Sequence, residues 1–194
     1  WHTVKAPNQP ITSKHNAGAE YLKGHGVDAV VNLPSDDFFT AGYFDFLAGA
    51  LESGRDMVRF ESLFFCDLPA QKALYARSLY NACGLMLSAE VMDKAGWRPW
   101  TEGKTHATDA FLLQNVKKHI KNPLVVPDTM DYGFVGVEFK TGDNLNAYAE
   151  LEAGLADQKP VSMQDMLSHF SLGEWPLYWN KRPRKRVKKK STAH

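Results

Sequence analysis

The chain has 194 residues, a net charge of +1 and a hydrophobic content of 44%. This length can bury one sizeable core and this composition excludes a disordered protein, so we expect a single globular domain. No apolar stretch is long enough to cross a bilayer, and residues 1–10 lack the basic and apolar regions of a secretory signal.

The two cysteines, Cys66 and Cys83, have neither the spacing of a metal site nor a disulfide pattern. We therefore expect two ordinary core thiols in a reduced, cytoplasmic setting. For a viral protein, this setting is the host cytoplasm.

Charge is distributed unevenly along the chain. Residues 181–194 hold eight basic and no acidic residues, which leaves 15 basic and 22 acidic residues in positions 1–180. The body therefore carries about −7 and the tail +8. Such a tail is too charged to pack, so we expect a domain at 1–180 followed by a disordered basic tail. The run Lys181–Lys190 predicts a nucleic-acid partner; a solvated terminus and contact with anionic lipid are the alternatives.

The first part of the chain alternates between strand and helix patterns. The expected elements are a strand at 4–6, a helix capped by Thr12 or Ser13 and ending near 23, a buried strand beginning at 27, a helix at 41–51, a strand at 56–65 and a helix at 69–80. This order favours an α/β fold with a mainly parallel sheet and helices on both faces.

A smaller mixed region is expected after Tyr80. Its elements are a strand at 83–87, a helix at 89–94 capped by Ser88, an aromatic loop at 97–100, a helix at 109–119, strands at 123–127 and 133–139, a turn at 140–144 and a helix at 163–170.

The strand beginning at Val27 ends in two adjacent carboxylates, Asp36 and Asp37. Open α/β sheets commonly place ligand sites at the carboxyl ends of strands. Mg²⁺ and Mn²⁺ prefer oxygen ligands and usually arrive with substrate phosphates. The pair therefore suggests a metal–diphosphate site, while a turn that caps the helix near Thr40 is the alternative.

Several motifs in this order carry a family resemblance. They are residues 14–21 (KHNAGAEY), 26–31 (GVDAVV), 35–37 (SDD), 84–88 (GLMLS), Thr108-Asp109 and 136–144 (GVEFKTGDN). Together they resemble a family 2-type glycosyltransferase with the glycosyltransferase-A fold, in a compact, phage-type form. The resemblance covers about positions 4–146 and implies a Rossmann-like domain that uses Mg²⁺ or Mn²⁺ and a nucleotide diphosphate sugar.

The resemblance also implies roles for individual residues. Asp109 takes the place of the family's catalytic base, and its alternative is a carboxylate stabilised by the helix dipole. Lys14, Asn16 and Asp36 take the positions that meet the nucleotide. Lys14 is otherwise a solvated surface lysine, and Asn16 otherwise fixes the neighbouring loop.

The chain departs from the family pattern in two places. Pro34 or Ser35 stands where members often carry the first aspartate, which leaves Asp36 and Asp37 as the candidates for metal contact. Members also usually begin with a nucleotide-binding strand and helix before the helix that holds Lys14 and Asn16. We expect that half to come from residues outside this sequence, or the fold to be a reduced one.

The chemistry of sugar transfer can be stated without the family. A metal held by Asp36 or Asp37 neutralises the leaving diphosphate, and Lys14 adds a further positive charge. A general base, for which Asp109 is the candidate, accepts the proton of the acceptor hydroxyl. A covalent intermediate needs a separate nucleophile, and the sequence offers no clear one, so we expect inversion.

Three further residues are candidates around this site. His106 lies three residues before Asp109 and is a candidate metal ligand, with a solvent-facing loop histidine as the alternative. Trp97 and Trp100 are candidates for stacking on the acceptor, and filling the core beneath the loop is the alternative for both.

Three functions are therefore weighed. The first is an inverting, metal-dependent glycosyltransferase, with modified viral DNA as an acceptor suggested by the basic tail. The second is a nucleotidyltransferase of related fold, although the sequence shows no glycine-rich phosphate loop. The third is a non-catalytic nucleic-acid-binding or assembly protein that retains the fold.

Overall fold

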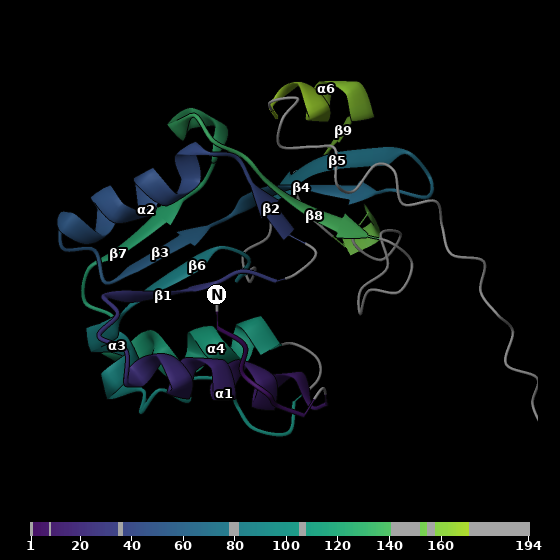
Figure 1. The fold of residues 1–194 in the computed structure, drawn as a ribbon. Helices are drawn as coiled ribbons and strands as arrows, with labels where there is room; N and C mark the ends of the chain where they lie inside the picture. Colours follow the sequence, from purple (N-terminus) through teal and green to yellow (C-terminus); the bar gives the residue numbers. More distant parts are fainter. Residues whose placement is uncertain are drawn as a thin grey trace, which may run out of the picture.

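The computed structural model describes residues 2–7, 9–34, 37–77, 82–104, 108–140, 152–154 and 158–170. Figure 1 shows the arrangement of its helices and strands. In chain order they are α1 (Ile11–Lys23), β1 (Ala29–Asn32), β2 (Asp37–Phe39), α2 (Gly42–Glu52), β3 (Met57–Phe60), β4 (Ser62–Asp67), β5 (Lys72–Arg77), β6 (Leu85–Ser88), α3 (Ala89–Lys94), α4 (Thr108–Val116), η1 (Lys117–His119), β7 (Pro123–Val126), η2 (Met130–Tyr132), β8 (Gly136–Lys140), β9 (Lys159–Val161) and α6 (Met163–Ser168).

The described strands form two mixed sheets. The first has the order β1-β6-β3-β7 and the second the order β2-β8-β4-β5-β9. Only the pairs β3–β7 and β4–β8 are parallel, and the other five pairs among the described strands are antiparallel. The predicted α/β fold, with one mainly parallel, Rossmann-like sheet of the glycosyltransferase-A type flanked by helices on both faces, is therefore wrong. The chain is α/β, but its described strands form two mixed sheets, and the helices on both faces are those of the first sheet.

One reason for the error is the segment 69–80, which was expected to be a helix. Residues 72–77 instead form β5, which pairs antiparallel with β4 from Ser62↔Arg77 to Asp67↔Lys72. The segment is rich in Ala, Leu, Lys and Gln, which favour helices, but this propensity is weak against tertiary packing. As a strand, β5 buries four consecutive residues, Ala73 to Ala76. The β4–β5 hairpin therefore stands where a helical crossover between parallel strands was expected. Strands joined directly by a hairpin pair antiparallel.

A second reason is the segment 56–65, which was expected to be one strand. It divides at Glu61, with β3 in the first sheet and β4 in the second. The backbone N–H of Glu61 donates to the carbonyl of Val126 at 3.0 Å, beyond the last β3–β7 pair. The apolar run is continuous in sequence because both strands are buried, so its pattern does not show the break.

The acidic corner also differs from the expected geometry. Strand β1 ends at Asn32, and Asp37 begins β2 instead of ending β1. Pro34 has no N–H with which to continue a ladder, and its carbonyl accepts from the backbone N–H of Asp37 at 3.2 Å. The chain thereby turns from the first sheet into the second, where Asp37 lies opposite Glu138.

Helix predictions had a mixed outcome. α2 and α3 lie where they were expected, and the Ser88 side chain caps α3 by accepting from the N–H of Val91. α1 begins after Pro10 without a side-chain cap, because the Thr12 hydroxyl bonds to the backbone of Lys104 instead. The strand expected at 4–6 does not form.

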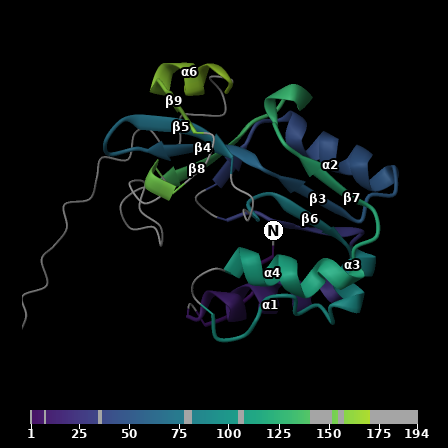
Figure 2. The same ribbon diagram turned by 180° about the vertical axis from the view of Figure 1, so that it is seen from behind.

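Helices α1, α3 and α4 lie on one face of the first sheet, and α2 lies on the other (Figures 1 and 2). The first of these interfaces buries Val30 and Leu87 against Met92 and Leu112, and the second buries Val58 and Met86 against Tyr43 and Leu47. The second sheet packs Phe64 and Val137 against α6 through Met166. This arrangement leaves β1 at one edge of the first sheet, above α1.

Two further expectations can be compared with the structure. Cys66 and Cys83 are both buried and neither forms a disulfide, as expected of core thiols. Within the described part of the chain, no helix has the length and apolar character needed to cross a membrane. The turn expected at 140–144 and the basic tail lie outside the described residues.

Candidate functional site

The turn formed by Ala82, Cys83 and Gly84 lies between the two sheets and is held from several sides. Gly84 donates its backbone N–H to the carbonyl of Asn32 at 2.8 Å, and its own carbonyl accepts from the Tyr43 hydroxyl at 2.9 Å. Its φ of +70° and the ring of Phe39, 2.6 Å from where a Cβ would stand, restrict the position to glycine. The sequence therefore fixes this turn tightly.

Asp109 reaches the turn from the first turn of α4. Its Oδ2 accepts from the backbone N–H of Ala82 at 3.0 Å, and its Oδ1 accepts from the Thr108 hydroxyl at 3.4 Å. Burial raises the pKa of this carboxyl, and the two hydrogen bonds oppose the rise in part. A half-buried carboxylate with a raised pKa is a feature of functional sites.

Asp37 reaches the same turn from the opposite side. The Cys83 thiol hydrogen-bonds to its carboxylate. Burial raises the pKa of the Cys83 thiol, and the negative charges of Asp37, Glu138 and Asp109 raise it further. Burial and nearby negative charge therefore keep the Cys83 thiol protonated, which makes it a poor nucleophile.

The third carboxylate, Glu138, is paired with a lysine. Glu138 lies opposite Asp37 in the β2–β8 register and forms an ion pair with the buried Lys140. Its charge is thereby compensated within β8. Asp109 instead accepts hydrogen bonds from two neutral donors, the backbone N–H of Ala82 and the Thr108 hydroxyl.

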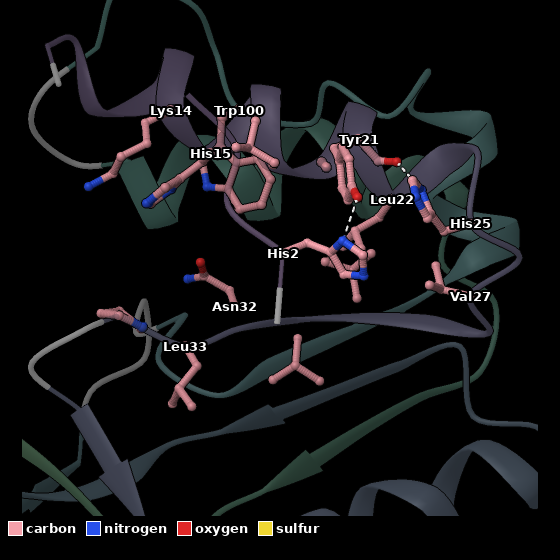
Figure 3. A pocket seen from close by; sticks show the side chains of 16 residues that line it. His2, Lys14, His15, Tyr21, Leu22, His25, Val27, Asn32, Leu33 and Trp100 are labelled. Carbon is pink, nitrogen blue, oxygen red and sulfur yellow. Dashed lines mark hydrogen bonds between the residues drawn. The ribbon is translucent and has the colours of Figure 1, made fainter. Parts of the chain in front are cut away.

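A pocket of about 690 Å³ lies between α1 and the β1 edge. Figure 3 shows its side chains, with Lys14, His15, Tyr21 and Trp100 on the α1 side and Asn32 and Leu33 on the β1 side. Asn32 joins this pocket to the turn, because its Nδ2 donates to the carbonyl of Ala82 at 3.0 Å. The N–H of that same Ala82 binds Asp109, so one residue contacts both the pocket wall and the carboxylate.

Two nitrogens in this pocket are buried without partners. They are His15 Nδ1 and Trp100 Nε1. The two rings pack edge to face with their centroids 5.1 Å apart. Burial lowers the pKa of His15, and the charge of Lys14 lowers it further. A neutral imidazole thus lies beside an indole ring.

The other end of the pocket is closed by a cluster of three rings. Tyr21 stacks on His25 at 4.2 Å, and its hydroxyl hydrogen-bonds to His2 Nδ1 at 3.0 Å. His25 Nδ1 bonds to the carbonyl of Tyr21 at 2.7 Å. This cluster therefore satisfies polar atoms of its own.

Asn16 positions Trp100. Its amide donates to the carbonyl of Trp100 at 2.8 Å and to Glu102 at 2.9 Å, and its Oδ1 accepts from the N–H of Trp100 at 3.1 Å. The Asn16 side chain is fully buried among these contacts. Trp97 is also buried in the core, where its Nε1 donates to Asp93 at 2.6 Å. The two tryptophans of the loop thus differ in whether their N–H has a partner.

The structure brings together some of the sequence candidates. Asp109 hydrogen-bonds to Ala82 and Asp37 to Cys83, so both contact one turn. Lys14 and Trp100 line the pocket, whose lining includes neither carboxylate. Asp36 and His106 lie outside the described residues. Sequence reasoning missed His15, Asn32 and Glu138. His15 adjoins Lys14 in the KHN motif, which could have drawn attention to it, but nothing in the sequence shows that its Nδ1 is unpartnered.

Whether a metal ion can bind depends on the donor atoms that the described residues offer. Within the described ranges, no group of three or more His, Cys, Asp or Glu side chains could hold a metal ion by itself. Asp37 supplies hard oxygen ligands suited to Mg²⁺ or Mn²⁺, and such ions usually complete their shell with water and substrate phosphates. The residues present thus fit an ion bound jointly with a substrate.

A scan against protein-family models gives no match, and a search of curated proteins gives no significant match. The residues of the turn and the pocket are therefore the features from which a function can be inferred.

Proposed function

We propose that this protein is a metal-dependent glycosyltransferase that moves a sugar from a nucleotide diphosphate to an acceptor hydroxyl. The observation that carries the proposal is the convergence of Asp37 and Asp109 on the Ala82–Gly84 turn, beside a pocket large enough for a nucleotide. Pockets for ligands of this size commonly have volumes of about 300–1,000 Å³.

Asp109 is the proposed general base. It must be ionised to accept the proton of the acceptor hydroxyl, and its raised pKa brings its basicity closer to neutral pH. The backbone N–H of Ala82 fixes one carboxylate oxygen, which orients the other toward the Thr108 side. A positioned base typically contributes a factor of about 10² to 10⁴ in rate.

Asp37 is the proposed metal ligand. A Mg²⁺ or Mn²⁺ ion at this carboxylate would neutralise charge on the leaving diphosphate. Lys14 is exposed at the pocket and provides a further cation for the same phosphates. The ion pair with Lys140 compensates the negative charge of Glu138, so Glu138 repels an anionic substrate less strongly.

A single displacement with inversion fits these residues better than a covalent intermediate. Cys83 is the side chain at the turn with nucleophilic chemistry, and its raised pKa keeps it protonated. With Asp37 assigned to the metal and Asp109 to the proton, one base and one ion suffice for direct attack by the acceptor.

The acceptor is proposed from charge. The eight basic residues of positions 181–194 would bind an anionic acceptor such as DNA in a salt-dependent manner. A cytoplasmic setting fits the buried thiols of Cys66 and Cys83, which form no disulfide.

The test is consumption of a panel of nucleotide sugars by the full chain with Mn²⁺, with Mg²⁺ and with EDTA. We expect metal-dependent release of nucleoside diphosphate, reduced at least about 100-fold in Asp37→Asn and in Asp109→Asn. Asp165→Asn is the control, since this exposed carboxylate lies in the first turn of α6, where it accepts from the Ser162 hydroxyl. Equal turnover in all four proteins would overturn both assignments.

A further inference from the structure

Ala82 is the residue through which the turn contacts Asp109, and it is held from two directions. Its backbone N–H donates to Asp109 Oδ2 at 3.0 Å, and its carbonyl accepts from Asn32 Nδ2 at 3.0 Å. The Thr108 hydroxyl lies farther from the carboxyl, at 3.4 Å, so Ala82 supplies the closer contact. Ala82 is fully buried, and it joins the side chain of Asn32 on β1 to the carboxylate of Asp109 on α4.

Asn32 holds the turn a second time through its own backbone. Its carbonyl accepts from the N–H of Gly84 at 2.8 Å, just beyond the last β1–β6 pair, Asn32↔Leu85. The Tyr43 hydroxyl also fixes Gly84, by donating to its carbonyl at 2.9 Å. Tyr43 thus holds the far end of the turn, whereas the Asn32 amide holds the end that binds Asp109.

The carbonyl of Ala82 does not depend on the Asn32 amide for a partner. It also accepts from the backbone N–H of Leu85 at 3.1 Å, within the turn itself. Asn32 is half-buried at the wall of the pocket (Figure 3), so its side chain is not enclosed in the core. Removing the amide therefore leaves no buried carbonyl unpartnered, and we expect the substituted chain to fold. What is lost is a constraint on the position of Ala82.

We propose that Asn32 is a positioning residue for Asp109: its amide fixes Ala82, and the N–H of Ala82 in turn orients the carboxylate. This assignment rests on the proposed function for the role of Asp109 as a base, and it adds a residue that acts through another. Reacting groups must be held within about 0.5 Å of the productive geometry by neighbours that are themselves locked in place. Asn32 also lines the pocket, so the pocket wall and the base share one chain of contacts.

The test is hydrogen exchange of the Ala82 amide in the ¹⁵N-labelled full chain. Wild type is compared with Asn32→Leu, which keeps a branched side chain without a donor, and with Asn32→Ser, whose hydroxyl is too short to reach the same carbonyl. We expect the Ala82 amide to exchange at least about tenfold faster in both variants, because its bond to Asp109 opens more often. Neither substitution adjoins Ala82 in sequence, so its intrinsic exchange rate is unchanged.

Asn122→Leu is the matched control. The Asn122 amide also donates to a backbone carbonyl, that of Gly54 at 2.9 Å, at the opposite end of the first sheet from Asn32. In this variant the Ala82 amide should exchange at the wild-type rate. The N–H of Val91, which donates to Ser88 in the cap of α3, is the internal reference. A general loss of stability would speed both amides equally and overturn the assignment, whereas a loss of positioning speeds Ala82 alone.

Steady-state kinetics give the second readout. We expect the Asn32 variants to lower kcat for nucleotide-sugar consumption about tenfold, because a misplaced base slows the reaction. The KM for the nucleotide sugar should change less than about twofold, because no contact to the nucleotide is removed. A raised KM with an unchanged kcat would instead make Asn32 a binding residue and overturn its role as a positioning residue.

Wild-type exchange of the Ala82 amide in the Asn32 variants would overturn the inference, and so would faster exchange with an unchanged kcat. If Asn32→Leu fails to fold, Asn32→Ser decides. These failures are separable from that of the proposed function. If wild type consumes no nucleotide sugar with metal while the Ala82 amide responds as expected, only the transferase is overturned. Sugar consumption with an unchanged Ala82 exchange rate would overturn only the role of Asn32.

Discussion

The first sheet with α1 and α4 differs from the second sheet in how its buried polar groups are paired. At the pocket, His15 and Trp100 each hold a nitrogen without a partner, and Asp109 is bound by neutral donors. In and beside the second sheet, Glu61 accepts from Arg59 and Arg77, and Lys140 pairs with Glu138.

Tyr75 completes the second region. Its hydroxyl donates to Ser62 at 2.7 Å and to Asp128 at 2.5 Å, and burial together with the Asp128 carboxylate raises the pKa of Tyr75 to about 12. Paired polar groups of this kind stabilise one structure. The pocket of the first region is instead a cavity that a ligand can enter. We therefore assign the pocket of the first region to binding, and Glu61, Lys140 and Tyr75 of the second region to structural support. Asp37, in β2, is the contribution of the second sheet to the proposed site.

The largest expected effect comes from the Ala82–Gly84 turn, which joins the two regions. In Gly84→Ala the new Cβ meets Phe39 at 2.6 Å and the backbone has φ +70°, so we expect a loss of about 3 kcal/mol in the free energy of unfolding. Urea denaturation measures this loss.

Gly96→Ala is the matched control for that substitution. Its φ of +66° is nearly the same, but nothing lies within 4 Å of its added Cβ, so a loss of about 1 kcal/mol is expected. Equal losses in the two variants would show that the close approach of Phe39 to the turn contributes nothing.

Glu61→Gln sharpens the comparison within the second region. Glu61 is 5% exposed and accepts from Arg59 at 2.8 Å and from Arg77 Nε at 2.8 Å. Without the carboxylate charge, the half-buried Arg59 keeps a weaker partner, and we expect a loss of about 2 kcal/mol in stability, with most of it from Arg59.

The control for that variant is Glu90→Gln. This carboxylate pairs with Lys94 and Lys121 on the surface, with 65% of the side chain exposed. Solvent screens such pairs, so denaturation should detect no change. A Glu61→Gln variant as stable as wild type would contradict the structural role of the second region.

The smallest effect is the pH dependence that Asp109 gives to stability. Because burial raises its pKa, the folded protein holds this proton more tightly than the unfolded chain does. The stability of wild type relative to Asp109→Asn should therefore fall as pH rises from the ordinary aspartate pKa to the raised one, and then level off. Urea unfolding of both proteins from about pH 3.5 to 8 measures it. A relative gain on raising the pH would contradict the assigned direction.

Local signals in the sequence predicted some of the fold. The cap residue Ser88, followed by residues that favour a helix, correctly predicted α3. The helical spacing of Tyr43, Leu47 and Leu51 correctly predicted α2. Both predictions succeeded because caps and periodicity depend only on residues within one element. The β4–β5 hairpin was missed because burial of both strands outweighed helix propensity. The sheet order depends on such pairings, so a prediction built on the alternation of elements failed.

The candidate site shows the same division between features that local sequence signals predict and features that depend on tertiary contacts. Two carboxylates separated by 71 positions, Asp37 and Asp109, were named from motif order, and the structure places both at one turn. The partners of these groups depend on tertiary contacts. The ion pair of Glu138 follows from the β2–β8 register, and the unpartnered Trp100 follows from the way Asn16 holds its backbone.

The central claim is that Asp37 and Asp109 act in one reaction, and a double-mutant cycle tests it directly. The kcat/KM for metal-dependent nucleotide-sugar consumption is measured for wild type, Asp37→Asn, Asp109→Asn and the double variant. We expect the double variant to be little slower than the worse single variant, because residues that act as a unit are not additive. The account would be contradicted if the fold-reduction of kcat/KM in the double variant equalled the product of the two single-variant reductions. It would also be contradicted if neither substitution changed kcat/KM.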